Sequence, residues 1–133
     1  MTIPDTVVWS LFLRRKKPSQ KIQGIFVDLI ENGQIGLFGI IKQELLSGVK
    51  TSGHFDSLTG TLSAFPTILA SETDHIMAGR LFNLCRSRGI QGSHIDFLIL
   101  AMSISNQCTV LTTDKDFGHY QKIIDFDLLI VSP

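Results

Sequence analysis

The sequence predicts an α/β fold in which a parallel β-sheet is covered by helices on both faces. Short apolar stretches of strand length alternate along the chain with longer segments of helical periodicity. Several stretches, such as FLILAM and DLLIVS, are almost continuously apolar, as expected of elements that are covered on both sides. The chain has 133 residues, of which 44% are hydrophobic, so residues 1–133 are expected to form one domain with a core of its own.

The first elements follow from start and stop signals. A strand at Met1–Asp5 is expected to lead into a short helix at Val7–Leu13, which is ended by basic residues and Pro18. Ser19 is a suitable N-cap for an amphipathic helix, and the pair Asn32-Gly33 is a typical helix stop.

The middle of the chain is expected to contain two strands and two helices. The pattern predicts a strand at Gln34–Phe38, a helix at Ile40–Val49, a helical segment at Phe55–Phe65 and a strand at Thr67–Ala70. Pro66 is expected to end the second of these helical segments.

The last third repeats the alternation. Ser71 or Thr73 is expected to cap a long helix that runs to about Arg88, and Ser93 to cap the next helix. The remaining elements are two strands with a short helical piece between them: Thr109–Thr113, His119–Ile124 and Leu128–Ser132.

One carboxylate stands out in this pattern. Asp96 lies near the start of the apolar segment SHIDFLILAM, where an unpaired charge would be costly to bury. Asp5 and Asp114 each follow an expected strand, and ligands of open parallel sheets bind outside the carboxyl ends of the strands. Together with Glu44, they suggest a site for a hard divalent cation such as Mg²⁺ or Mn²⁺.

Each of these acids also has a simpler explanation. Asp5 would serve as a helix cap, Glu44 as an exposed helical residue, and Asp114 as part of an Asx-turn. Asp96 is close enough to a helix start for the helix dipole to stabilise its charge. Spacing alone therefore leaves both interpretations open.

Composition narrows the functional classes. The net charge is zero, so no overall field attracts nucleic acid. The local exception is a basic run, which is either a solvated patch at a helix end or a contact for RNA phosphates: Arg14, Arg15, Lys16 and Lys17. No apolar run reaches the ~18 residues of a membrane span, and no signal peptide is evident, so we expect a cytoplasmic protein.

Four segments, in order, resemble the motifs of PIN-domain nucleases. IPDTVVWSLFL resembles the opening strand with its Asp-Thr pair, and GIIKQELLSG resembles the helix that carries an inward Glu. GIQGSHIDFLILAMSI is similar to the third motif, in which an Asp begins an apolar helix, and TVLTTDKDF to the fourth. The small size and the DTxVW opening look most like VapC toxins of toxin–antitoxin pairs.

The resemblance implies specific roles for residues of this chain. It assigns the metal-binding and catalytic acids to Asp5, Glu44, Asp96 and Asp114, with Asp116 as a secondary acid and with Thr6 and Thr112 as neighbours that orient the carboxylates. It implies a three-layer α/β/α sandwich with a central parallel sheet. The activity would be that of a Mg²⁺- or Mn²⁺-dependent endoribonuclease, the toxin of a type II toxin–antitoxin system. The implied partners are an RNA substrate, a VapB-like antitoxin and a second copy in a homodimer.

Two alternatives remain open. The first is a catalytically silent PIN-like module that binds RNA or protein, although mutually repelling carboxylates serve no purpose in such a module. The second is a metal-dependent phosphohydrolase, because enzymes of that class also place acids at strand ends. The DxD pattern expected there after the first strand is replaced by DTV in this chain.

Overall fold

The structure is a computed structural model that describes all residues, 1–133. Helices and strands alternate along most of the chain. The elements, in order, are β1 (Thr2–Pro4), α1 (Thr6–Leu13), α2 (Gln20–Glu31), β2 (Leu37–Phe38), α3 (Gly39–Leu46), α4 (Ser52–Leu62), β3 (Thr67–Ile68), α5 (Glu72–Ser87), α6 (His94–Ser105), β4 (Thr109–Thr112), α7 (Asp116–Gln121) and β5 (Asp127–Ile130).

All strand pairs are parallel, as the sequence predicts. One sheet has the order β1-β4-β5, and a second pairs β2 with β3. A parallel bridge between Thr2 and Ile35 joins the two, so the strands lie in the order β3-β2-β1-β4-β5. The chain first builds outward on one side of β1 and then returns to build on the other side. The strand order therefore reverses at β1, which makes the carboxyl end of β1 the expected ligand site.

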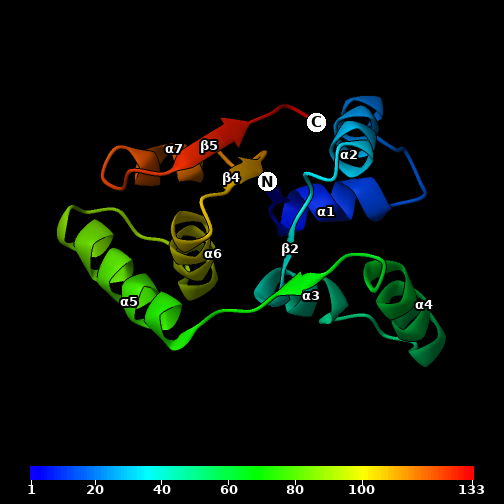
Figure 1. Cartoon of the computed structure of the whole chain (residues 1–133), viewed down its shortest axis with the longest axis horizontal. Coiled ribbons are helices and arrows are strands. Elements are labelled where there is room, and N and C mark those ends of the chain that lie inside the picture. Colours follow the sequence, from blue (N-terminus) through cyan, green and yellow to red (C-terminus); the bar gives the residue numbers. More distant parts are fainter.

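Helices lie on both sides of this sheet. In Figure 1 the strands form a band from β5 down to β3, with α5 and α6 on one side and α1 and α2 on the other. The helices α5 and α6 pack along each other, and α1 packs on α2 and α3. The predicted α/β/α architecture with a central parallel sheet is confirmed.

The core lies between the central strands and the covering helices. Ile3 of β1 and Val110 and Leu111 of β4 are fully buried, as is most of the apolar face of α6. Trp9 of α1 is also fully buried and meets the rings of Phe26 and Phe65 edge to face, with centroids 5.0 Å away in both cases. No helix is long and apolar enough to cross a membrane.

The predicted caps are present. Ser19, Ser71 and Ser93 each accept a hydrogen bond on Oγ from the backbone N–H three residues later. Ser71, rather than Thr73, is therefore the cap of α5. Gly33 and Gly89 follow α2 and α5 with φ of 64° and 77°, the left-handed conformation that ends a helix most easily at glycine.

Several boundaries differ from the prediction. The strand expected at Gln34–Phe38 is regular only at Leu37–Phe38, and α4 ends at Leu62, before Phe65. The helix expected at His119–Ile124 begins earlier, at Asp116, because the Asp116 N–H bonds to the Asp114 side chain and turns the chain there.

Candidate functional site

The first candidate residue lies where the strand order reverses. Asp5 follows β1 directly and is only 5% exposed. Its Oδ1 accepts the N–H of Val8 at 3.1 Å, which makes it the N-cap of α1. The capping function predicted as the simple explanation is therefore real, but it occupies only one carboxylate oxygen. The other oxygen, Oδ2, accepts the hydroxyl of Thr112 at the end of β4.

The next candidates form the loop after β4. The fully buried Thr112 hydroxyl accepts the N–H of Asp114 at 2.9 Å while it donates to Asp5. Asp114 Oδ1 in turn accepts the N–H of Asp116 at 2.9 Å, and Asp116 lies 3.8 Å from the ring of His119. This chain of contacts fixes the carboxyl ends of two neighbouring strands relative to each other.

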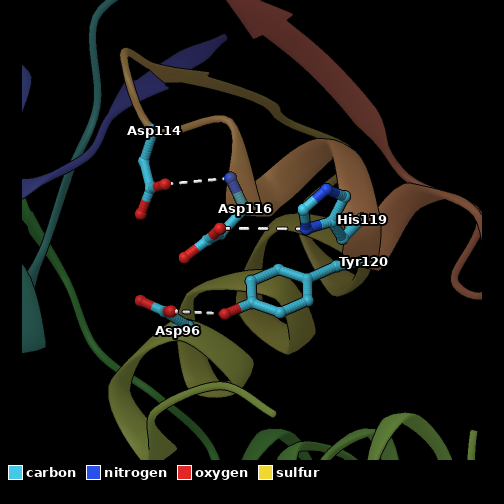
Figure 2. Close-up of polar contacts among 5 residues, drawn as sticks. All are labelled: Asp96, Asp114, Asp116, His119 and Tyr120. Atoms are coloured by element: carbon cyan, nitrogen blue, oxygen red, sulfur yellow. Dashed lines mark hydrogen bonds and ion pairs between the residues drawn. The ribbon is translucent and has the colours of Figure 1, made fainter. Parts of the chain in front are cut away.

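Asp96 approaches the same loop from α6. Figure 2 shows the carboxylates of Asp96, Asp114 and Asp116 facing a common space in front of α7. Asp96 Oδ2 accepts the hydroxyl of Tyr120 at 2.8 Å, and the Asp96 N–H donates to the Ser93 cap. Tyr120 is 1% exposed, and its ring packs against those of Phe97 and Phe117.

Glu44 comes from a third direction, on α3. Its Oε1 accepts the hydroxyl of Thr6 at 2.6 Å, and Thr6 is the residue after Asp5. The structure thus connects Glu44 to the start of α1, whereas no direct contact joins it to the other acids.

The electrostatics of these acids are unfavourable without a cation. Burial raises the pKa of Asp5, and the nearby charges of Asp114 and Asp96 raise it further. Burial and the charge of Asp114 likewise raise the pKa of Asp96. No Lys or Arg forms an ion pair with any of them, since the contact of Asp116 with His119 is the only ion pair in the chain. Carboxylates that repel one another and have no Lys or Arg side chain to neutralise them are suited to bind a hard divalent ion.

The acidic side chains do not form a complete metal-coordination site in this structure. No three His, Cys, Asp or Glu side chains converge closely enough to hold one metal ion. Each acid is instead turned toward a hydrogen-bond donor of the protein. Mg²⁺ commonly uses only one or two carboxylates and fills its other positions with water and substrate oxygens, so this donor set still fits it.

The basic run lies away from the acids. Asp5 caps the N-terminus of α1, and Arg14 is the C-cap at its other end. The eight residues of α1 place the two ends roughly 12 Å apart. An RNA strand that contacts both the acids and the basic run must therefore extend along α1.

Two residues of the site, Tyr120 and Gly92, were not expected from the sequence. Tyr120 was not expected to contact an acid, and Gly92 had no assigned role. A Cβ at Gly92 would overlap Oη of Tyr120 and come within 2.8 Å of its Cζ, so the absence of a side chain there leaves room for the tyrosine. The only sequence signal was the position of Tyr120, four residues after Asp116 on a short helix, which puts both on one face.

Comparisons with known proteins agree with this geometry. The sequence model of the PIN domain family matches residues 2–123. A search of curated proteins finds no match. Solved structures that are similar in fold include three toxin–antitoxin or related complexes.

The first of these is VapBC2 from Rickettsia felis bound to a promoter DNA fragment, with a TM-score of 0.81, 18% identity and 98% of each chain covered. The second is FitAcB from Neisseria gonorrhoeae, with a TM-score of 0.79, 20% identity, and 97% of this chain and 96% of that chain covered. The third is DNA-bound VapBC from Salmonella typhimurium, with a TM-score of 0.76, 17% identity, and coverage of 97% and 96%. At these identities, the similarity establishes the fold.

Proposed function

The chain belongs to the PIN domain family, and from this premise we propose that it is a Mg²⁺- or Mn²⁺-dependent endoribonuclease. PIN domains form a nuclease family that generally uses divalent metal ions. The observation that carries the proposal for this chain is the group Asp5, Asp96 and Asp114. The charges of Asp114 and Asp96 raise the pKa of Asp5, the charge of Asp114 raises the pKa of Asp96, and none of the three has a Lys or Arg partner.

The residues of the site have separate tasks in this proposal. Asp5 at the end of β1, Asp114 after β4 and Asp96 at the start of α6 would hold the cation, one or two of them directly and the rest through bound water. When bound, Mg²⁺ or Mn²⁺ supplies positive charge that stabilises the phosphodiester oxygens and favours ionisation of an attacking water. The Thr112 hydroxyl holds one oxygen of Asp5, which orients this carboxylate.

Glu44, Asp116 and Thr6 complete the site at its edge. Glu44 accepts the hydroxyl of Thr6, so its carboxylate is fixed beside the start of α1, where it can ligate through water or take a proton. Asp116 is exposed and adds negative charge beside Asp114. The basic residues Arg14, Arg15, Lys16 and Lys17 contact the RNA backbone beyond the acids.

The proposal is tested by cleavage of RNA with Mg²⁺ or Mn²⁺, with the native protein compared with Asp96→Asn. We expect cleavage by the native protein and a loss of at least a hundredfold in the variant, because a ligand that holds the cation is neutralised. Asp125→Asn, which removes an exposed acid outside the site, is the matched control and should cut at the native rate. Equal rates for all three proteins would show that the site is wrongly assigned.

The alternatives give different outcomes in the same experiment. Tight RNA binding without product, unaffected by a chelator, would favour a silent binding module. Hydrolysis of phosphomonoesters in place of RNA would favour a phosphohydrolase.

We also propose that the chain is the toxin of a type II pair with a VapB-like antitoxin, and that it forms a homodimer. The support is that its structural neighbours come from VapBC complexes, including one described as a member of the VapBC family of toxin–antitoxin systems from Mycobacterium tuberculosis. A neighbouring reading frame for a small DNA-binding protein, and suppression of RNA cleavage by its product, would test the pairing. Sedimentation of the purified chain would test the dimer.

A further inference from the structure

A groove at the end of α1 distant from Asp5 has no part in the acidic site. It has a volume of about 620 Å³ and lies between the end of α1 and one face of α4. Seven residues line it: Leu13, Arg14, Arg15, His54, Ser57, Leu58 and Thr61. Five of them are polar, and none is a carboxylate.

The polar groups of this groove are free to bind a ligand. Arg14 and Arg15 are exposed and form no ion pair with any acid of the chain. The His54 ring and the Ser57 hydroxyl also form no hydrogen bond within the protein, whereas the Thr61 hydroxyl bonds back to the α4 backbone. Two guanidinium groups, an imidazole and a hydroxyl around one hollow form a set of donors that matches phosphate oxygens.

The basic run does not act as one patch in this structure. Arg14 and Arg15 line the groove, whereas Lys16 and Lys17 do not. All four side chains are exposed, but only the two arginines face the hollow.

The end of α1 is anchored where the groove begins. The side-chain amide of Gln23 on α2 donates to the backbone oxygen of Phe12 at 2.8 Å, and the rings of Phe12 and Phe26 stack at 4.0 Å. The backbone that carries Arg14 is thus held between two helices. A side chain carried on fixed backbone loses less conformational freedom on binding than one on a free loop.

We infer that this groove is a second RNA-contact site, which holds the phosphodiester backbone of a single strand whose scissile bond lies at the acidic site. The inference rests on the proposed ribonuclease function. The two ends of α1 are roughly 12 Å apart, a distance that about three to four stacked nucleotides span at ~3.4 Å per phosphate. The groove therefore recognises the strand without reading its bases, and α1 sets the spacing between the held phosphates and the cut.

The test is binding of a fluorescent single-stranded RNA in EDTA, where no cleavage occurs. Arg14→Ala combined with Arg15→Ala should weaken binding at least tenfold. The slope of log affinity against log salt should become shallower by about 1.4, because each lost phosphate contact on a single strand contributes about 0.7. The double lysine variant, Arg14→Lys with Arg15→Lys, keeps the positive charges. Its loss of binding free energy should be less than half of the loss in the double alanine variant.

Two control variants remove the same charge elsewhere. Lys16→Ala with Lys17→Ala alters the neighbouring residues outside the groove. Arg80→Ala with Arg88→Ala alters two exposed arginines of α5 and its C-cap, and Figure 1 shows α5 at the opposite end of the molecule from α4. The α5 pair should bind RNA within about threefold of the native protein. The lysine pair contacts the RNA backbone outside the groove, so its loss should weaken binding less than the loss of the arginine pair. Equal weakening in all three double variants, or none in the arginine pair at 14 and 15, overturns the inference.

A competition experiment distinguishes RNA from an acidic protein as the ligand of the groove. Polyglutamate of matched charge should compete at least tenfold less well than RNA of the same number of charges. If polyglutamate binds as tightly as RNA and loses affinity in the same Arg14 and Arg15 variant, the groove is a surface for acidic polypeptides and the inference is wrong.

The outcome is separable from that of the proposed function. If the native protein cuts RNA and Asp96→Asn does not, while binding is unchanged by the arginine substitutions, only the groove assignment fails. If the arginine substitutions weaken binding but no protein cuts RNA, the ribonuclease proposal fails and the groove remains an RNA contact.

Discussion

Tyr120 holds one oxygen of the Asp96 carboxylate. Its hydroxyl donates at 2.8 Å to Oδ2, and its buried ring packs against Phe97 and Phe117. Burial and the charge of Asp96 raise the pKa of Tyr120, so the hydroxyl remains a donor at any physiological pH. We therefore expect Tyr120 to be a positioning residue for the carboxylate.

Tyr120→Phe tests this role at the level of one atom. The variant keeps the ring and should fold, but it loses a hydrogen bond to a charged group, typically about 1.5–3 kcal/mol. We predict a fall in kcat of about tenfold or more with little change in KM, and weaker Mn²⁺ binding by calorimetry. Unchanged metal affinity and kcat would assign Tyr120 to packing alone.

Gly92→Ala provides a second route to the same contact. The added methyl would overlap Oη of Tyr120, so the hydroxyl must move away from Asp96. We predict the same phenotype as for Tyr120→Phe, and a smaller further effect when both changes are combined, because part of the clash disappears with the hydroxyl. Fully additive effects would contradict a shared cause.

The raised pKa of Asp96 also predicts a stability effect. A carboxyl whose pKa is raised on folding favours the protonated form, so its ionisation opposes folding above its usual value near 4. Asp96→Asn should therefore stabilise the metal-free protein at pH 7, by an amount on the order of 1 kcal/mol. Urea unfolding in EDTA measures this, with Asp125→Asn as a control that should be neutral. A destabilised Asp96→Asn would mean that the carboxylate is held by contacts that an amide cannot replace.

At the scale of elements, the start of α5 carries a carboxylate whose pKa is lowered on folding, in contrast to that of Asp96. Asp74 is buried, and burial alone would raise its pKa, but bonds from the Ser71 N–H and the Ser105 hydroxyl lower it. These contacts complete a capping box and join α5 to α6. An Asn can accept on only one oxygen, so Asp74→Asn should cost about 1–2 kcal/mol at pH 7.

The pH dependence of this cost has a definite sign. A depressed carboxyl pKa contributes stability that is fully present above the unfolded value near 4 and is lost as the pH falls through the folded value. The difference between the native protein and Asp74→Asn should therefore shrink as the pH is lowered from 6 to 3. Urea titrations at several pH values measure it, and a constant difference would assign the cost to geometry alone.

Helices were predictable from the sequence to a greater extent than strands. Serine caps and glycine stops are local signals, and Ser19, Ser71, Ser93 and Gly33 act as expected. The strand at Gln34–Phe38 was predicted too long, because its regular part depends on pairing with β3 and β1, which the sequence does not reveal. The start of α7 was also missed, because it depends on a side-chain bond of Asp114.

At the scale of the whole molecule, the candidate site follows from strand order. Asp5 and Asp114 could be placed at strand ends from the sequence, because parallel strands present their carboxyl ends at one edge. Asp96 could be singled out as a lone charge in an apolar segment, and the family resemblance linked it and Glu44 to the strand-end acids. The helices that carry these two residues reach that edge only through the packing of α3 and α6. The Tyr120 contact and the role of Gly92 are products of that packing, and the sequence offered only the four-residue spacing of Asp116 and Tyr120 as a signal.

This dependence on the whole fold predicts how a metal ion should affect stability. The acids come from β1, α3, α6 and the loop after β4, and they are far apart in the unfolded chain. A cation that binds only the folded state stabilises it by about 2.7 kcal/mol at one hundred times its dissociation constant. We therefore expect Mn²⁺ or Mg²⁺ to raise the Tm of the native protein in proportion to the logarithm of the metal concentration above that constant.

The double variant Asp96→Asn with Asp114→Asn should show no such shift in Tm. Asp74→Asn should show the full shift from a lower starting Tm, because Asp74 lies outside the site. A shift of equal size in the double variant would place the bound ion elsewhere on the molecule.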